Sequence, residues 1–216
     1  MRNAAFLAFA LALTLLQANM HRLVGPLGLH GWTPSAVYVA EGSGLNGIDV
    51  APHVLAEISQ LGSGTRAIGV YPQRWSEPKP RCVALWGVND PGNVGTVIRG
   101  ALAFGAGSVA LGPGTADPYG HKAVRASMGA LFSVPVARVR QVSELPGRRV
   151  ALVAREGVPL TELEDAGTLV VGAEREGLPD AVVAACDDVA HIPIAQADSL
   201  NAAMAATIAL YELGVR

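Results

Sequence analysis

The chain has 216 residues, of which half are hydrophobic and 16% are charged, and its formal net charge is −2. This length provides for one large domain or two small ones, and the apolar content excludes a disordered chain. The charge balance excludes a generally basic nucleic-acid binder, so any nucleic acid would be bound by a local patch. The two cysteines, Cys82 and Cys186, belong to no CxxC or Cys/His cluster. Neither a zinc site nor a disulfide framework is therefore indicated.

The first patterned segment is "AAFLAFALALTLL", residues 4–16, an apolar run without charge. It is too short to span a bilayer, which takes ~20 apolar residues. With Arg2 before it, the run also fits the core of a signal peptide, but Ala18-Asn19-Met20 is a poor cleavage site. We expect a buried helix of an N-terminal domain in a cytoplasmic protein without membrane contact. A secreted or membrane-anchored protein is the alternative.

The next stretch alternates strand and helix patterns. A strand is expected at 34–42, a helix at 51–62 and a second strand at 66–72. The segment "QRWSEPKPR", 73–81, contains two prolines and mixed charges, which is typical of a linker. The chain is accordingly divided into a small α/β domain at 1–75, a linker at 76–80 and a larger domain at 81–216.

From residue 81 onward, strands and helices alternate. Strands are expected at 82–88, 108–112, 134–139, 149–154, 168–172 and 190–194. Helices are expected at 93–105, 121–132, 179–186 and 199–213. Continuous Val/Leu/Ala runs such as "TLVVG" indicate strands buried on both faces. The alternation predicts an α/β fold with a parallel sheet covered by helices.

The turn "NDPGNVGTVIRG", 89–100, joins a strand to a helix and raises the question of a phosphate-binding loop. Its glycines do not fit G-x-G-x-x-G, and it lacks the G-K-[ST] of a P-loop, so a generic dinucleotide-binding dehydrogenase is disfavoured. Asn93 is expected to cap the helix, and Arg99 to lie on its open face, at the sheet edge where α/β folds bind ligands. Taken alone, the turn is accounted for by a capping Asn and a solvated Arg, without a ligand.

Two further stretches resemble functional loops. "TLVVGAEREGLP", 168–179, is a buried strand ending at Gly172, where a ligand could approach the backbone closely. "AHIPIAQADSLNAAMAATIALYELG", 190–214, leads through a polar loop into a long helix that Ser199 is expected to cap. That helix is apolar on two sides, which predicts burial between layers or in a subunit interface. The alternative for 168–179 is a solvated loop with a tight turn.

Together, "NDPGNVGTVIRGALAFG", "HKAVRASMGALFSVPV", "LVVGAEREGLP" and "IPIAQADSLNAAMAATIALYE" resemble, in order and spacing, the motifs of the SpoU (TrmH-type) RNA ribose methyltransferases of the SPOUT class. The resemblance covers roughly residues 81–213. It implies a trefoil-knotted parallel-sheet domain, bound S-adenosylmethionine, a homodimer, and transfer of a methyl group to a ribose 2′-hydroxyl of tRNA or rRNA. DNA, which lacks that hydroxyl, would not be a substrate.

The resemblance also implies roles for individual residues. The residues expected to line the cofactor are Gly172, Ile192 and Leu200. The residues expected around the transferred methyl group and the ribose are Asn93, Arg99, Glu174, Ser199 and Asn201. No metal is expected.

Two departures from the family pattern matter. The loop "AQAD", 195–198, lacks the usual glycine and is one residue short, so the alternative is a non-catalytic RNA-binding protein that retains the knotted fold. The N-terminal stretch resembles, more weakly, a ribosomal-protein-like RNA-binding domain. Its first 30 residues fit that pattern poorly, which predicts a shortened or altered RNA-docking surface.

Overall fold

The computed structural model describes residues 6–11, 31–59, 64–163, 166–196 and 199–214. Residue contacts divide the chain into two compact units, Met1–Gln73 and Arg74–Arg216. Within the described residues, no helix has the length and apolarity needed to cross a bilayer. In the same residues, no group of three or more His, Cys, Asp or Glu side chains is arranged to hold a metal ion.

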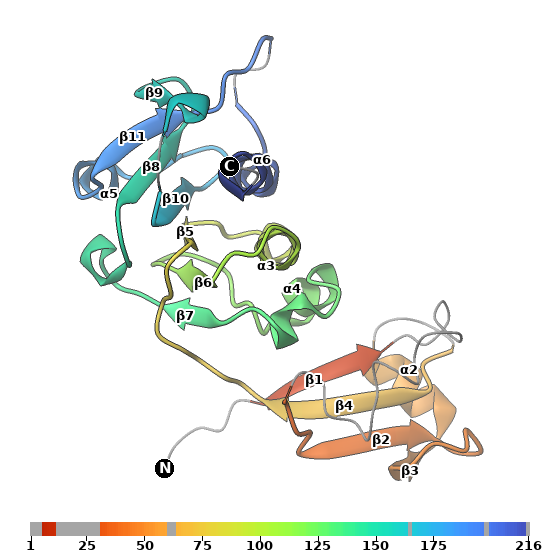
Figure 1. Cartoon of the computed structure of the whole chain (residues 1–216). Helices are drawn as coiled ribbons and strands as arrows, with labels where there is room; N and C mark the ends of the chain where they lie inside the picture. The colour runs from red at the N-terminus through yellow and green to blue at the C-terminus, as the bar shows by residue number, and fades with distance from the viewer. Residues whose placement is uncertain (1–5, 12–30, 60–63, 164–165, 197–198, 215–216) are drawn as a thin grey trace. The chain divides into compact units, whose positions relative to one another are not determined.

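In its described residues, the N-terminal unit consists of a four-stranded sheet and the helix α2 (Figure 1). Its elements are β1 (Phe6–Leu11), β2 (Ala36–Ala40), β3 (Ile48–Val50), α2 (Pro52–Ser59) and β4 (Ala67–Pro72). The strand order is β1-β4-β2-β3, and β4 runs antiparallel to both of its neighbours. Leu55 of α2 is fully buried against Ala40 and Ile68 of the sheet, which gives this unit its own core.

The helix predicted at 4–16 is wrong over residues 6–11, which form β1. This strand pairs with β4 from Phe6 opposite Pro72 to Leu11 opposite Ala67. The remaining residues of the prediction lie outside the described part of the chain. A short apolar run has no periodicity that separates a helix from a strand, and the open edge of β4 decided the outcome by offering hydrogen-bond partners.

The C-terminal unit is built on a seven-stranded sheet in the order β7-β6-β5-β10-β8-β11-β9, in which every pairing is parallel. Its strands are β5 (Cys82–Trp86), β6 (Ser108–Leu111), β7 (Val136–Arg138), β8 (Arg149–Val153), β9 (Val158–Pro159), β10 (Thr168–Gly172) and β11 (Asp188–His191). All residues of β5, β6 and β10 are buried. The predicted α/β fold with a parallel sheet is confirmed.

Helices cover both faces of this sheet (Figure 1). They are α3 (Pro91–Ala103), α4 (His121–Ala126), α5 (Asp180–Ala184) and α6 (Ala202–Gly214), with 3-10 turns η1 (Ala130–Phe132), η2 (Val142–Glu144) and η3 (Leu160–Glu162). α3, α4 and α6 lie on one face, and α5 lies on the other. The helix predicted at 121–132 is interrupted after α4, because Met128 and Gly129 have positive φ angles of 50° and 88°.

The strand order differs from the chain order at one place that matters for function. β10 lies between β5 and β8, so the chain leaves β5 through α3 toward β6 and leaves β10 through α5 in the opposite direction. Open α/β sheets bind ligands beyond the carboxyl ends of the strands, at such a reversal of strand order. The ends of β5 and β10 therefore mark the place to look for a site.

The segment leading into β5 packs against the C-terminal unit. The backbone N–H of Ser76 donates to the Val136 carbonyl at 2.9 Å, and the N–H of Lys79 donates to Ser108 Oγ at 2.8 Å. Residues expected to act as a linker thus have fixed hydrogen-bond partners on β7 and β6.

Aromatic contacts hold the start of the same segment. The Trp75 ring meets the Tyr119 ring edge to face, with centroids 5.1 Å apart, and the Arg138 guanidinium lies 4.1 Å from the Trp75 centroid. The Tyr119 hydroxyl donates to the Arg74 carbonyl and accepts from the Arg74 N–H at 3.2 Å. Burial raises the pKa of Tyr119 to about 12, so the hydroxyl stays protonated at neutral pH.

Candidate active site at the carboxyl ends of the strands

The turn after β5 places Asn93 differently from the prediction. Asp90 is the N-cap of α3, because its Oδ1 accepts the Gly92 N–H at 2.6 Å, and Pro91 follows at the first helical position. The expectation that Asn93 caps the helix is wrong. Asn93 lies inside the first turn, and its amide is available for other partners because Asp90 already performs the capping.

Asn93, Glu174 and Asn201 form a closed hydrogen-bonded cluster. Asn93 Nδ2 donates to Glu174 Oε1 at 2.6 Å, and Asn201 Nδ2 donates both to Asn93 Oδ1 at 3.2 Å and to Glu174 Oε1. The three residues come from three motifs that are far apart in the chain, and all three were predicted from the sequence. We call this set the polar cluster.

Asn201 also fixes the start of α6. Its Oδ1 accepts the N–H groups of Ala203 at 2.9 Å and Met204 at 3.2 Å, which is the bonding of an N-cap. The expectation that Ser199 caps this helix is wrong, since the helix begins three residues later than Ser199. Because Asn201 Oδ1 is bound to the backbone, its Nδ2 must point toward Glu174, which settles the orientation of the amide.

Gly172 makes room for the turn that carries Glu174. The turn 173–177 is closed by two backbone hydrogen bonds between Ala173 and Gly177, of 3.1 and 2.9 Å. A Cβ atom on Gly172 would lie 2.3 Å from the Gly177 carbonyl carbon and 2.5 Å from the Leu178 nitrogen. The sequence predicted that a ligand would approach the backbone closely at Gly172. In the structure, the backbone of Gly177 and Leu178 makes this close approach.

A cavity of about 560 Å³ opens beside this turn. The three residues predicted to line the cofactor, Gly172, Ile192 and Leu200, all line it. Glu174 and Ser199 line it as well, so the cavity and the polar cluster share Glu174. Asn93 and Asn201 border an adjacent groove with Met204 and Ile208 of α6.

Arg99 does not join the polar cluster within one chain. It lies six residues after Asn93 on α3, which places it about 120° around the helix from Asn93. Its side chain is exposed, and no hydrogen bond or ion pair of that side chain is found among the described residues. Asn93 faces α6, whereas Arg99 lies on the side of α3 toward α4.

The sequence prediction missed polar residues at the rim of the cavity. Arg155 and Glu156 follow β8, and Asp180 begins α5; all three line the cavity. Their strand was predicted, and the carboxyl ends of parallel strands meet at one edge, so the position of Arg155 and Glu156 after that strand was an available signal.

Groups with displaced pKa values lie away from this cavity. Burial raises the pKa of Cys186 to about 11. The side-chain hydrogen bond from Arg149 lowers the pKa of Asp187, which lies at the amino end of β11. Neither Cys186 nor Asp187 lines the cavity, so both belong to the structure of the unit rather than to its site.

Comparison with known proteins identifies the family. Residues 80–211 match the SpoU rRNA Methylase family, and the chain belongs to it. Two curated relatives are the Bacillus subtilis 23S rRNA (guanosine(2553)-2'-O)-methyltransferase RlmP, 38% identical over 58% of this chain, and the Streptomyces viridochromogenes 23S rRNA (uridine(2479)-2'-O)-methyltransferase, 39% identical over 56%. The aligned part covers 54% and 48% of these relatives, so the chain spans about half the length of the curated relatives it matches.

Solved structures resemble more of the chain. An rRNA methyltransferase from Sinorhizobium meliloti is 28% identical, with a TM-score of 0.81 that covers 97% of this chain and 87% of that one. The SpoU methyltransferase AviRb from Streptomyces viridochromogenes, in complex with AdoMet, is 27% identical, with a TM-score of 0.77 over 86% of this chain and 84% of its own. The prediction of a parallel-sheet α/β fold of the SpoU methyltransferase type is thus confirmed.

Proposed function

We propose that this protein transfers a methyl group from S-adenosylmethionine to a ribose 2′-hydroxyl of RNA, either rRNA or tRNA. The observation that carries the proposal is the cavity at the ends of β8 and β10, which shares Glu174 with the polar cluster. The rRNA 2′-O-methyltransferase relatives and the AdoMet-bound structure of a similar fold support it.

The cavity suits the cofactor in size and lining. Its volume of about 560 Å³ lies within the ~300–1,000 Å³ typical of pockets for small organic ligands. Leu152, Ile192 and Leu200 give it apolar walls for a base, and Glu174 places a carboxylate at its edge. When bound, S-adenosylmethionine supplies an activated methyl group.

The protein's part in this reaction is alignment. Holding two reactants in the productive geometry lowers the activation barrier by up to ~7–11 kcal/mol. General-base assistance typically raises the rate ~10²–10⁴-fold, which corresponds to a smaller reduction of the barrier. We assign Asn93 to orient the ribose, while Glu174 holds Asn93 and Asn201 in place. Ser199 and Asn201 hold the loop before α6.

Arg99 has a separate role in the proposal. A guanidinium has five N–H donors and no acceptor, so it is poorly suited to take a proton from the ribose. We assign it to clamp a substrate phosphate and to stabilise the developing 2′-alkoxide. An Arg99→Lys variant should lose most of its turnover, because lysine lacks the bidentate geometry; near-full turnover would contradict the clamp.

The assembly proposed is a homodimer through α6. Met204, Ile208 and Tyr211 lie three and four residues apart on this helix and are 55%, 39% and 53% exposed. The opposite side of α6 is buried on the same chain through small residues such as Ala206 and Ala209. An exposed apolar row beside Asn93 and Asn201 is suited to a second copy, which would cover the groove next to the polar cluster.

The remaining parts of the proposal concern topology and location. We propose a trefoil knot in the C-terminal unit, an RNA-binding role for the N-terminal unit, and a cytoplasmic enzyme. The domain assignment, 1–75 and 81–216 with a linker at 76–80, is proposed on the same basis.

The first test is a calorimetric titration of S-adenosylmethionine into the wild type and into Leu200→Arg. Micromolar binding by the wild type that is lost in Leu200→Arg is expected, because an arginine at Leu200 would fill the cavity. Ile48→Arg adds the same charge at an exposed residue of the N-terminal unit and should bind as the wild type does. Equal binding by Leu200→Arg would place the cofactor elsewhere.

The same titration decides between the proposal and its alternative. A wild type that binds RNA but not S-adenosylmethionine would be a non-catalytic RNA-binding protein that retains the fold. The altered loop at 195–198 motivates this alternative, and its last two residues lie outside the described part of the chain. Methylation of a matched DNA oligonucleotide would contradict the ribose 2′-hydroxyl as target.

A further inference from the structure

Residues 91–143 have a charge balance unlike that of the whole chain. The chain contains 16 Lys and Arg and 18 Asp and Glu. The basic residues in this stretch are Arg99, Lys122, Arg125, Arg138 and Arg140, and Asp117 is its only acidic residue. Acidic residues outnumber basic ones in the rest of the chain. α3, α4 and η1 all lie in this stretch, and this layer of helices contains no Asp or Glu within its own elements.

A glycine brings α3 unusually close to α4. A Cβ atom on Gly95 would lie 2.2 Å from the Ala123 carbonyl oxygen and 2.7 Å from Ala126 Cβ, so only glycine allows this approach. Arg99 follows Gly95 by four residues and therefore lies on the same side of α3, one turn further along. The Arg99 side chain is exposed on the flank of α3 that borders α4.

Further positively charged residues lie on the exposed side of α4. Ala123 and Val124 are buried, whereas Lys122 and Arg125 are exposed. Residues three apart on a helix are neighbours, so Lys122 and Arg125 lie together on α4. The contact at Gly95 thus brings cations from two helices to one side of the unit.

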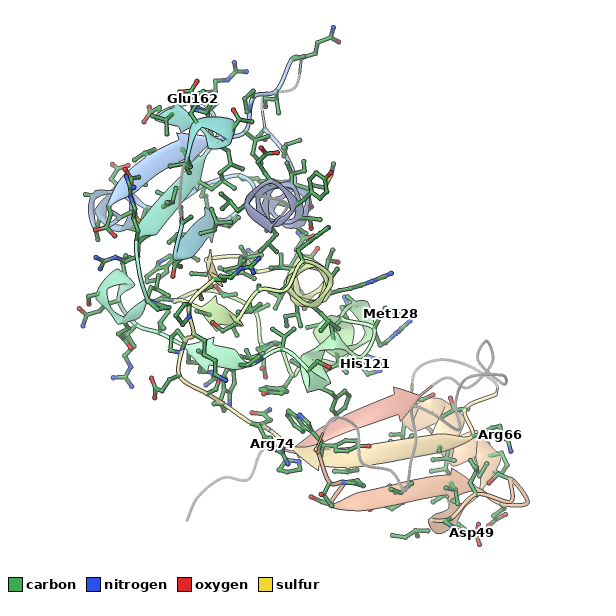
Figure 2. The ribbon with its side chains drawn as sticks, in the orientation of Figure 1. Asp49, Arg66, Arg74, His121, Met128 and Glu162 are labelled. Carbon is green, nitrogen blue, oxygen red and sulfur yellow. The ribbon has the colours of Figure 1, made fainter. Side chains whose placement is uncertain are left out.

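The turn that follows α4 is exposed to solvent. Met128 is 71% exposed and has a φ of 50°, in the left-handed region that non-glycine residues rarely adopt. Figure 2 labels His121 and Met128, which mark the start of α4 and the turn after it. An exposed methionine beside cations offers an apolar contact for a sugar or a base.

We propose that Arg99, Lys122 and Arg125 form a single surface that binds the phosphate backbone of the RNA. This inference rests on the proposed function and extends it, since it places the strand beyond the methylated ribose along α3 and α4. Phosphate contacts of this kind position a strand without reading its sequence. The acidic balance elsewhere in the chain would steer the strand toward this layer.

The lysine content provides a direct test on the unaltered protein. Lys79 and Lys122 are the only two lysines in the sequence, and both are exposed. The wild type would be acetylated with and without a 30-nucleotide oligouridylate, and both lysines quantified by mass spectrometry. We expect the RNA to slow acetylation of Lys122 severalfold at low salt and to leave Lys79 unchanged. Equal protection of both lysines, or none at Lys122, would overturn the proposal.

Salt dependence of binding gives a second, independent readout. For single strands, each phosphate contact contributes about 0.7 to the slope of log affinity against log salt, so Lys122→Gln with Arg125→Gln should lower that slope by about 1.4. Lys79→Gln is the matched control and should keep the wild-type slope. An unchanged slope in the double variant, or a wild type that does not bind oligouridylate at low salt, would refute the surface.

Cofactor titration separates this inference from the proposed function. The double variant should bind S-adenosylmethionine as the wild type does, because neither residue lines the cavity. If RNA binding depends on Lys122 and Arg125 but no cofactor binds, the proposed activity fails and the surface stands. If the cofactor binds and methyl transfer occurs while the double variant keeps full RNA affinity, only the surface fails.

Discussion

The polar cluster leads to a prediction for Asn201, whose side-chain amide makes two separable sets of hydrogen bonds. Its Oδ1 caps α6, and its Nδ2 donates to Asn93 and Glu174. Asn201→Ala removes both sets. Asn201→Asp keeps an oxygen for the cap, because Asp and Asn are equally good N-caps, but replaces the donor by a second carboxylate beside Glu174.

The magnitudes follow from these contacts. Loss of the cap in Asn201→Ala should cost about 1 kcal/mol of the free energy of unfolding. In Asn201→Asp the cap remains, and since both side chains are exposed, repulsion between two carboxylates about 4 Å apart is worth about 1 kcal/mol in a water-like dielectric. An aspartate at the helix start recovers about 0.3–1 kcal/mol from the helix dipole. Asn201→Asp should therefore be more stable than Asn201→Ala.

Urea denaturation of five proteins tests this reasoning: the wild type, Asn201→Ala, Asn201→Asp, Glu174→Gln and the double variant that combines Asn201→Asp with Glu174→Gln. Replacing Glu174 by Gln removes the repulsion, so the double variant should be about 1 kcal/mol more stable than the sum of the single effects predicts. Asn201→Asp as unstable as Asn201→Ala would show that Oδ1 does not cap α6. A coupling of zero would show that the contact between Asn201 and Glu174 is absent in solution.

Three further predictions concern packing and titration. Gly95→Ala should destabilise the protein by about 1–3 kcal/mol in thermal unfolding, because its Cβ would lie 2.2 Å from a backbone oxygen of α4; a neutral result would contradict the close approach of α3 and α4. Tyr119→Phe removes two hydrogen bonds to the Arg74 backbone and should lower the free energy of unfolding, measured in urea, by about 1–3 kcal/mol; Tyr38→Phe, whose hydroxyl makes no hydrogen bond among the described residues, is the control. The raised pKa of Cys186, about 11, keeps its thiol protonated at pH 8, so iodoacetamide should modify it far more slowly than a free thiol with a pKa of ~8.5. Its labelling rate should rise as pH approaches 11, and rapid labelling at pH 8 would exclude this environment.

Strand and helix placement in the C-terminal unit was largely predictable from the sequence. Thr168–Gly172 was predicted with the observed bounds, since a continuous Val/Leu run ending in glycine is typical of a buried parallel strand. The helix after β5 was predicted two residues late, because Asn93 was taken for the cap that Asp90 provides. β3 and β9 were missed, as three- and two-residue strands show no periodicity of their own.

Some features of the candidate site could be predicted from the sequence, and others could not. The residues of the polar cluster could be named from three motifs, because these motifs resemble those of the SpoU RNA ribose methyltransferases. Their mutual contacts could not, since Asn93 and Asn201 are 108 residues apart and meet only after α3 packs on α6. The separation of Arg99 from Asn93 around α3 followed from the helical period, but the sequence did not show which neighbour each residue faces.

The sequence by itself determined which segments are buried, that the sheet is parallel, and which side chains stand at the strand ends. These properties follow from local composition and periodicity, which act over a few residues. Only the tertiary structure decided that 6–11 pairs as a strand, that β10 lies between β5 and β8, and that Gly95 lets α3 touch α4. Each of these outcomes depends on a partner that is distant in the chain, so hydrogen-bond pairing and close packing, rather than local preference, selected it.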